Sequence, residues 1–171
     1  MGIGSGSVCT TRLQTGIGYP QFSCILDTKP NIPDNCYIIS DGGIQTIGDF
    51  SKAYGAGADF VMSGGMFAGH NECSGEVVEE NGVLYNVFYG MSSANAMNKH
   101  YGSIANYRSA EGKCVKIKNK GSVSNTISDI LGGIRSTMTY IGATNMSEFY
   151  NKCEFIRVNN QANRIFSGKE L

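Results

Sequence analysis

Two short apolar runs, each ending in a glycine pair, stand out in the pattern of hydrophobic and polar positions. The first is CYIISDGG at 36–43, and the second is DFVMSGG at 59–65. Apolar runs of four or five residues without alternation are typical of strands buried on both faces, as in a parallel sheet. We therefore predict buried parallel strands over residues 36–40 and 59–62.

The stretch between these strands has a helical period. Ile47, Phe50 and Tyr54 recur at the spacing of one helical face, and Gly55 or Gly57 can end the helix. Strand, helix and strand then form one βαβ unit. Glycine-rich turns follow the carboxyl ends of both strands.

A different pattern begins near residue 75. Residues 75–90 read as a β-hairpin that turns at Asn81-Gly82, because this dipeptide is the strongest short hairpin signal. In residues 113–120 two apolar side chains alternate with lysines, which predicts an exposed strand or flap. These lysines could meet a phosphate, but a solvated face is the preferred explanation.

The carboxyl-terminal third is helical in pattern. A helix is predicted over 125–142, a short helix over MSEFYNKC, and a final extended piece at EFIRV. Gly132 and Gly133 each destabilise the middle of the long helix by about 1 kcal/mol relative to alanine. Their presence therefore indicates that another element or a ligand approaches the helix closely at this point. The apolar stripe of this helix consists of Ile127, Ile130, Leu131, Ile134, Met138 and Ile141.

Composition narrows the function classes. The chain has 171 residues, 41% of them hydrophobic and 16% charged, which is typical of one globular domain. Its formal net charge is zero, so it lacks the basic surface expected for nucleic acid or an anionic membrane. No apolar run approaches the length of a membrane span. Six cysteines without a C-x-x-C pair indicate reduced thiols in the cytoplasm.

The glycine pairs at 42–43 and 64–65 predict an anion site. Turns that follow neighbouring strands of a (β/α) barrel commonly bind phosphate through backbone amides. Asp41 precedes the first pair, at a strand end where a carboxylate can accept hydrogen bonds from ribose hydroxyls. Ordinary tight turns are the alternative explanation for each pair.

Cys9 lies in a glycine-rich loop, GIGSGSVCTTR, and two interpretations of it stay open. A free cysteine usually behaves as a small hydrophobic residue. Flanking glycines and the polar run Thr10-Thr11-Arg12 favour a nucleophile instead. His70 and His100 lie in polar, loop-like surroundings and do not supply an obvious partner. A Rossmann loop is rejected, because no strand precedes GIGSGS in this chain.

Several ordered motifs carry a family resemblance. GSVCTTR, TGIGYPQ, SDGG, GAGADFVM, SGGM, AGH, FYGMSS, YRSAEGK and DILGGIRS follow one another as in the GMP reductase family of the IMP dehydrogenase/GMP reductase superfamily. The likeness runs from residue 2 to RIFS at 164–167.

This resemblance implies an α/β fold that is the C-terminal portion of a (β/α)8 TIM barrel, incomplete in this chain. Residues 1–171 would form a single partial domain: the catalytic Cys loop after a sixth strand, the last two βα units, a flap at about 70–120 and the C-terminal helices. The amino-terminal half of the barrel would be a missing partner.

The resemblance also implies a reaction, the reductive deamination of GMP to IMP and ammonia by NADPH. Cys9 would attack purine C2 and form a covalent thioimidate, while Thr11 and Glu111 would relay protons to the leaving ammonia. The GMP-binding residues implied are Asp41, Gly42, Gly43, Gly64, Gly65, Gly90, Met91, Ser92, Arg108, Ser109, Ala110 and Gly112, with Glu111 among them.

Further ligands and an oligomer follow from the same resemblance. A homotetramer in the cytoplasm is implied, in which part of the NADPH site crosses a subunit boundary. The NADPH-binding residues implied are Met91, Tyr107, Arg108, Ser136, Thr137, Met138 and Thr139. A potassium ion would be surrounded by the Gly4, Gly6 and Cys9 carbonyls together with Arg12.

Two alternatives stay beside this interpretation. An IMP dehydrogenase shares the cysteine loop and phosphate turns, but it activates water with an arginine–tyrosine pair on a larger flap. YRSAEGK with Glu111, and GYPQ after the loop, favour the reductase. The other alternative is a nucleotide-binding fragment without turnover, and the joint presence of Cys9, Thr11 and Glu111 weighs against it.

Overall fold

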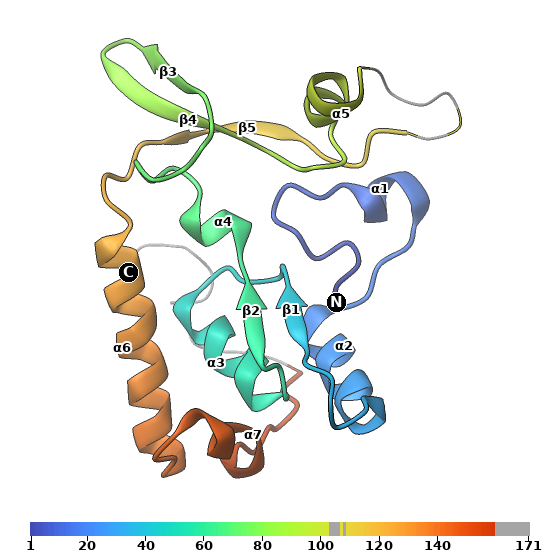
Figure 1. Ribbon diagram of the computed structural model, residues 1–171, viewed down its shortest axis with the longest axis vertical. Helices are drawn as coiled ribbons and strands as arrows, with labels where there is room; N and C mark the ends of the chain where they lie inside the picture. Colours follow the sequence, from blue (N-terminus) through green and yellow to red (C-terminus); the bar gives the residue numbers. More distant parts are fainter. Residues whose placement is uncertain (103–106, 108, 160–171) are drawn as a thin grey trace.

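The computed structural model describes residues 1–102, 107 and 109–159. These residues form a helical body around a two-stranded parallel sheet, and a three-stranded antiparallel arm that lies across one end of the body (Figure 1). The elements are α1 (Thr11–Thr15), α2 (Gln21–Thr28), β1 (Ile39–Asp41), α3 (Ile47–Gly55), β2 (Phe60–Met62), α4 (Gly64–Phe67), β3 (Val77–Glu80), β4 (Val83–Tyr89), α5 (Ala94–Tyr101), β5 (Cys114–Lys118), α6 (Ser124–Ile141) and α7 (Phe149–Lys152), with 3₁₀ turns at Lys29–Asn31 and Met146–Glu148.

The βαβ unit that the sequence predicts is present. β1 and β2 pair in parallel, with Ser40 opposite Val61, and α3 connects them. A capping box begins α3, in which the Thr46 side chain and the Asp49 side chain bond to each other's backbone amides. This arrangement satisfies amides that have no partner inside the helix.

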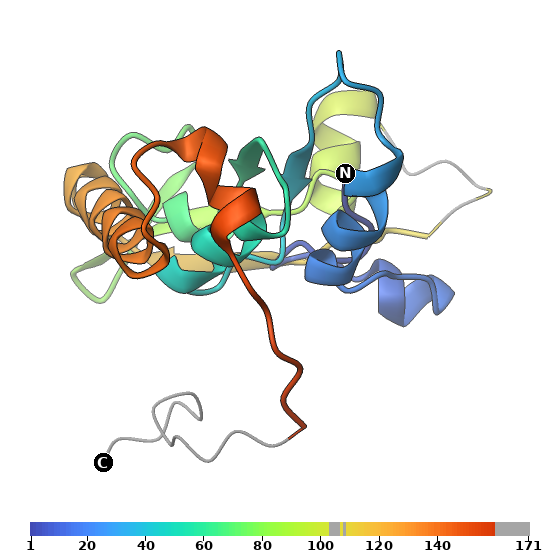
Figure 2. The same ribbon diagram turned by 90° about the horizontal axis from the view of Figure 1, so that it is seen from below.

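One face of the sheet is covered and the other is not. Ser40 is fully buried and Val61 half-buried on the face covered by helices, while Ile39, Phe60 and Met62 are 43%, 55% and 52% exposed. The expectation of burial on both faces is therefore wrong for this chain. Helices α2 and α3 lie on one side of β1 and β2, and no described element covers the opposite side (Figure 2).

The core consists of two apolar clusters on the helical side. The first joins α2, the start of β1 and the end of α3 around Ile25 and Ala56. The second joins α3, α6 and α7, and Phe149 of α7 is 1% exposed within it. Val61 packs against both clusters, so β2 connects the two halves of the body.

Helix α6 matches the predicted segment but only part of the predicted stripe. Ile130 and Ile134 are buried, whereas Ile127 and Leu131 are 42% and 43% exposed. The narrower stripe reflects a helix that packs on the body along one line. The predicted close packing occurs at Gly133, where a Cβ would lie 2.3 Å from Ile47 Cγ2, while one at Gly132 would meet nothing within 4 Å.

The arm is the predicted hairpin with a third strand added. β3 and β4 turn at Asn81 and Gly82, whose φ angles of 53° and 75° are the left-handed values that a two-residue hairpin requires. β5 pairs with β4, and its lysines alternate with the half-buried Val115 and Ile117 as expected.

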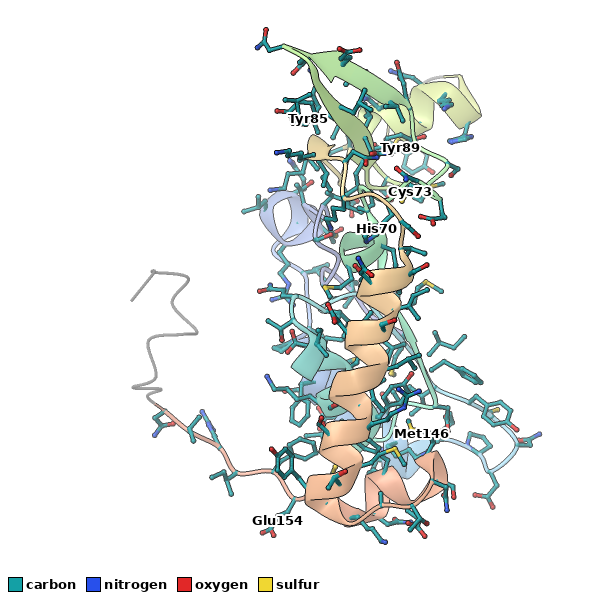
Figure 3. All side chains as sticks on the ribbon, turned by 90° about the vertical axis from the view of Figure 1, so that its left-hand side faces the viewer. His70, Cys73, Tyr85, Tyr89, Met146 and Glu154 are labelled. Atoms are coloured by element: carbon teal, nitrogen blue, oxygen red, sulfur yellow. The ribbon has the colours of Figure 1, made fainter. Side chains whose placement is uncertain are left out.

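A buried polar cluster joins the arm to the body. His70 lies in a loop with polar partners, as predicted, and only 2% of it is exposed there. One ring nitrogen contacts the Gly121 carbonyl at 3.2 Å, and the other contacts Thr126 Oγ1 at 3.0 Å. Figure 3 shows His70 at the end of α6 that faces the arm. Asn86 of β4, also 2% exposed, donates to the His70 carbonyl.

The predicted short helix near 146–153 is present as a 3₁₀ turn followed by α7. Residues 154–158 lie outside the helices and strands. Phe155 nevertheless packs edge-on against Phe22 of α2, with ring centroids 4.7 Å apart.

Candidate active site

The glycine-rich loop at residues 2–20 lies beside the carboxyl end of β1, beneath the arm (Figure 1). Arg12 closes this loop: its Nε donates to the Gly4 carbonyl at 3.0 Å and its Nη2 to the Tyr19 carbonyl at 2.8 Å. Glycine is needed at position 18, because a Cβ there would lie 2.4 Å from Arg12 Nε. The loop that carries Cys9 is thus held at both ends by one side chain.

Cys9, Thr11 and Glu111 form a continuous hydrogen-bonded chain. The Cys9 thiol donates to Thr11 Oγ1 at 3.2 Å, and the Thr11 hydroxyl donates to Glu111 Oε2 at 2.7 Å. One hundred residues separate Thr11 from Glu111 in sequence, so the fold, not local spacing, brings them together. A hydroxyl between a thiol and a carboxylate can pass a proton from one to the other.

Three backbone segments meet behind the hydrogen-bonded residues Cys9, Thr11 and Glu111. Residues 111–113 pair with the Cys9 segment on one side, through an antiparallel bridge between Cys9 and Gly112. They pair with residues 90–93 on the other side, through a parallel bridge between Ser93 and Gly112. Glu111 therefore reaches Thr11 from a backbone that is fixed on both sides.

Two adjoining hollows open in front of Cys9. One, of about 230 Å³, is lined by Cys9, Thr11 and Glu111 with the glycines of the loop. The other, of about 240 Å³, is lined by Gly42, Gly43, Gly64 and Gly65. Both hollows share a wall whose residues are Ser5, Gly6, Val8, Asp41, Gly90 and Met91. The structure therefore places the candidate nucleophile and the glycine turns along one continuous cleft, with Asp41 between them.

The glycine turns supply fewer free amides than predicted. The Gly42 amide donates to the Met62 carbonyl at 3.1 Å, and the Gly43 amide donates to the Ser5 carbonyl at 2.9 Å. The expectation that these two amides wrap an anion needs correction, because both are already engaged within the protein. The amides of Gly64 and Gly65 open helix α4, where first-turn amides lack intrahelical partners.

Sequence reasoning missed Ser5 and Ser7. Ser5 ties the loop to the strand end, since its hydroxyl donates to the Asp41 carbonyl at 2.8 Å. Both serines line the hollow with the glycine turns. Their alternation with glycine in GSGS was the available signal, because small residues with hydroxyls in a glycine loop are typical of anion sites.

The remaining site candidates divide into near and far groups. Gly90, Met91 and Ser92 line the cleft, and Met91 is 65% exposed. Ser109 and Ala110 directly precede Glu111, Tyr107 is 86% exposed, and Arg108 lies outside the described residues.

The candidates on α6 form the far group. Ser136–Thr139 lie on the opposite side of β1 and β2 from the Cys9 loop (Figure 1). Thr137 faces α3, where its hydroxyl lies 2.8 Å from Ser51 Oγ, and Met138 packs against the core. The outward positions in this stretch are Ser136 and Thr139.

Backbone carbonyls of the loop provide the donor chemistry for a monovalent cation. The Gly4 carbonyl accepts from Arg12 Nε, the Gly6 carbonyl from the Cys9 amide and the Arg12 carbonyl from the Gly16 amide. A carbonyl oxygen has two lone pairs, so each keeps one for an ion.

The described residues contain no candidate transition-metal site, no disulfide and no membrane-spanning helix. Within them, no group of three or more His, Cys, Asp or Glu side chains could hold a metal ion. All six cysteines are free. None of the described helices is both long enough and apolar enough to span a membrane.

Fold and site together define an α/β protein with a thiol-centred cleft at the carboxyl ends of parallel strands. The family described as "IMP dehydrogenase / GMP reductase domain" matches residues 1–165, and this chain belongs to that family.

Several relatives carry the name GMP reductase. GMP reductase 1 of Homo sapiens is 56% identical over 98% of this chain and 49% of its own length. GMP reductase of Yersinia enterocolitica is 54% identical over 97% of this chain and 48% of its own length. This chain therefore spans about half the length of these relatives.

A solved structure has the same fold. A cysteine-to-alanine variant of GMP reductase from Trypanosoma brucei, in complex with guanosine 5'-monophosphate, superposes with a TM-score of 0.86 at 35% identity. The match covers 98% of this chain and 35% of that one.

Proposed function

We propose that this chain is the cysteine-bearing half of a GMP reductase, which converts GMP to IMP and ammonia at the expense of NADPH. The observation that carries the proposal is the Cys9–Thr11–Glu111 chain of hydrogen bonds, with distances of 3.2 and 2.7 Å, at the base of a cleft. The kinship with GMP reductases of 54% to 56% identity supports it.

In the proposed complex, the two hollows of the cleft would hold the two ends of a purine nucleotide. The purine would lie in the hollow at Cys9, and the phosphate would reach the turn at Gly64 and Gly65 in the adjoining hollow. Asp41 lines both hollows, so its carboxylate would accept hydrogen bonds from the ribose hydroxyls between them. The remaining proposed GMP contacts are Gly42, Gly43, Gly90, Met91, Ser92, Arg108, Ser109, Ala110 and Gly112.

The residues of this chain then act in sequence. Cys9 loses its proton to the Thr11–Glu111 pair, and its sulfur bonds to purine C2. The bond from C2 to the amino nitrogen breaks with its electron pair going to nitrogen, and Glu111 returns a proton through Thr11, so that ammonia leaves. A thioimidate between Cys9 and the purine results. When bound, NADPH supplies the hydride that reduces C2, and the carbon–sulfur bond breaks to give IMP and the Cys9 thiolate.

Proposed NADPH contacts lie on two surfaces. Met91 is exposed in the wall of the cleft and Tyr107 is exposed four residues before Glu111, and Arg108 would join them. Ser136, Thr137, Met138 and Thr139 belong to α6, which lies on the other side of β1 and β2 from the Cys9 loop (Figure 1). In the proposed homotetramer, α6 would therefore serve the Cys9 site of a neighbouring subunit. A potassium ion would be held by the carbonyls of Gly4, Gly6, Cys9 and Arg12 and would steady the loop.

The fold proposal is that the chain supplies the last two βα units of a TIM barrel, the arm at about 70–120 as a flap and the C-terminal helices. The Met1 carbonyl accepts a hydrogen bond from the Asp41 amide at 2.8 Å, so the first residue lies along the outer edge of β1. The exposed face formed by Ile39, Phe60 and Met62 would become the barrel interior. Free cysteines support a cytoplasmic location for the protein.

The test joins residues 1–171 to the half of human GMP reductase 1 that this chain does not match. We call this chimera the assembled enzyme. It should oxidise NADPH only with GMP and form IMP and ammonia. Cys9→Ala should abolish turnover and leave GMP binding within about tenfold, because the thiolate acts in the reaction and not in ground-state binding.

Cys36→Ala is the matched control, since Cys36 is an exposed thiol away from the cleft. This variant should keep full activity. Turnover by Cys9→Ala at the rate of the parent would refute the nucleophile. Oxidation of IMP with NAD in place of GMP reduction would replace the proposal with a dehydrogenase, and GMP binding without either reaction would replace it with a binding fragment.

A further inference from the structure

Gly112 lies where three backbone segments cross, and its surroundings explain why it has no side chain. The Lys113 amide donates to the Val8 carbonyl at 2.9 Å, and the Thr10 amide donates to the Glu111 carbonyl at 2.9 Å. On the opposite side, the Glu111 amide donates to the Ser92 carbonyl at 2.8 Å. Residues 111–113 are thus the central strand of a small three-stranded crossing.

Space at the centre of this crossing is tight for any side chain at position 112. A Cβ on Gly112 would lie 3.0 Å from Ser93 N, 3.2 Å from Ser93 Cβ and 3.3 Å from Gly90 Cα. Most of these atoms are backbone, which cannot turn aside as a flexible side chain can. Ser93 is also 2% exposed and caps helix α5 by accepting from the Ala96 amide, so it cannot easily retreat.

The crossing fixes Glu111 in particular. Both backbone groups of Glu111 are bonded, the amide to the 90–93 segment and the carbonyl to the Cys9 segment. Its carboxylate lies 2.7 Å from Thr11 Oγ1, a distance that a displacement of a few tenths of an ångström would lengthen beyond a strong hydrogen bond. Gly112 itself lines neither hollow of the cleft, unlike Glu111 and Gly90.

We propose that Gly112 is a positioning residue for the reaction. Its missing side chain lets the 111–113 segment pass between the Cys9 loop and residues 90–93, and this crossing sets the Glu111 carboxylate on Thr11. Gly112 would act through Glu111, and this role replaces the GMP contact proposed for Gly112 above, because Gly112 lines neither hollow. This inference rests on the proposed function.

A double-mutant cycle in the assembled enzyme tests it, with Gly112→Ala and Glu111→Gln made singly and together. Gly112→Ala should lower kcat by about 10-fold, because its Cβ contacts of 3.0 to 3.3 Å displace the segment by less than the 1 Å that can cost about 100-fold. The KM for GMP should change by less than about threefold. In the Glu111→Gln background the same alanine should cost less than about threefold more, since the group it positions has already lost its function.

Gly132→Ala is the control, because a Cβ at that position meets nothing within 4 Å. It should leave kcat unchanged. Three results would each overturn the proposal: an unchanged kcat in Gly112→Ala, an equal loss in both backgrounds, or a raised KM for GMP with kcat preserved. The last result would make Gly112 a substrate contact.

A second variant keeps the test decisive if Gly112→Ala does not fold. Gly90→Ala crowds the same crossing more gently, since its Cβ would lie 3.4 Å from Gly112 Cα and 3.4 Å from the Val8 carbonyl oxygen. It should lower kcat by about threefold, and only where Glu111 is present. A parent chimera that does not reduce GMP at all would contradict the proposed function. An active parent whose kcat is unchanged by Gly112→Ala would contradict this inference alone.

Discussion

Glu111→Gln is the most informative single substitution, because it keeps the shape of the side chain and removes the proton acceptor. In the structure, the Thr11 hydroxyl donates to Glu111 Oε2 at 2.7 Å and accepts a hydrogen bond from the Cys9 thiol at 3.2 Å. A glutamine amide at this position can still bond to Thr11 through its oxygen or nitrogen. It cannot take the thiol proton or return it to the departing nitrogen.

The expected loss follows from that single difference. A positioned general acid–base group contributes about 10²- to 10⁴-fold, so turnover should fall by that factor in the assembled enzyme. Formation of the thioimidate should suffer more than the later hydride step. Single-turnover mixing, followed separately for ammonia release and for NADPH oxidation, measures the two steps. GMP binding should stay within about threefold, since the carboxylate faces Thr11.

Glu80→Gln is the matched control, because it makes the same change on the same arm, at a residue paired with Lys116 on the exposed side. It should not alter turnover. An unchanged rate of ammonia release in Glu111→Gln would remove Glu111 from the mechanism. A loss of the hydride step alone would assign it a different role.

The remaining predictions concern assembly and stability. Residues 1–171 expressed alone should associate or precipitate and show no measurable NADPH oxidation, because the face formed by Ile39, Phe60 and Met62 is uncovered; an active monomer in ultracentrifugation would refute this. Gly133→Ala should lower the free energy of unfolding of the assembled enzyme by about 1–3 kcal/mol through overlap with Ile47, whereas Gly132→Ala should not lower it; equal denaturation midpoints for the two variants would contradict the packing. Burial raises the pKa of Asp49, but amide hydrogen bonds from Thr46 and Gln45 outweigh it and the pKa is lowered overall. Asp49→Asn should therefore lower the free energy of unfolding by about 1 kcal/mol at neutral pH. This difference between variant and parent should vanish as the pH falls from the ordinary carboxyl pKa of about 4 through the lowered pKa. A difference in unfolding free energy that persists in acid would show that the charge of Asp49 is irrelevant.

Much of the fold could be predicted from the sequence because its signals are local. The βαβ unit follows from apolar runs and a 3.6-residue period, and the hairpin follows from Asn81-Gly82, where both residues must adopt positive φ. The helices α1, α2, α4 and α5 were not predicted. Each has no more than eight residues, so its period is too short to separate from loop.

Burial was predicted less well than secondary structure. Ile39 and Ile127 have the same apolar character as buried neighbours, and their exposure depends on which elements cover them. His70 shows the same limit. Its polar sequence neighbours correctly predicted a loop, but its burial depends on Gly121 and Thr126, more than fifty residues away in sequence.

The site could be predicted only in part for the same reason. Cys9 and Thr11 are two residues apart in sequence, so the sequence points to both together, but nothing local connects them to Glu111. The amides of Gly42 and Gly43 illustrate a further limit. A glycine pair predicts a turn, and only tertiary contacts with Met62 and Ser5 determine whether its amides stay free.

The arm has a consequence for how activity would be lost. Glu111 lies three residues before β5, and residues 90–93 directly follow β4. Asn86 is the one buried residue of these strands, whose other residues are half-buried or exposed. A small sheet of this kind opens locally at a lower free energy than a packed helical core. Each opening would withdraw Glu111 from Thr11 while α3, α6 and α7 remain folded. Amide hydrogen exchange in β4 and β5 would then report the same event as heat inactivation, and both would precede the loss of helical circular dichroism.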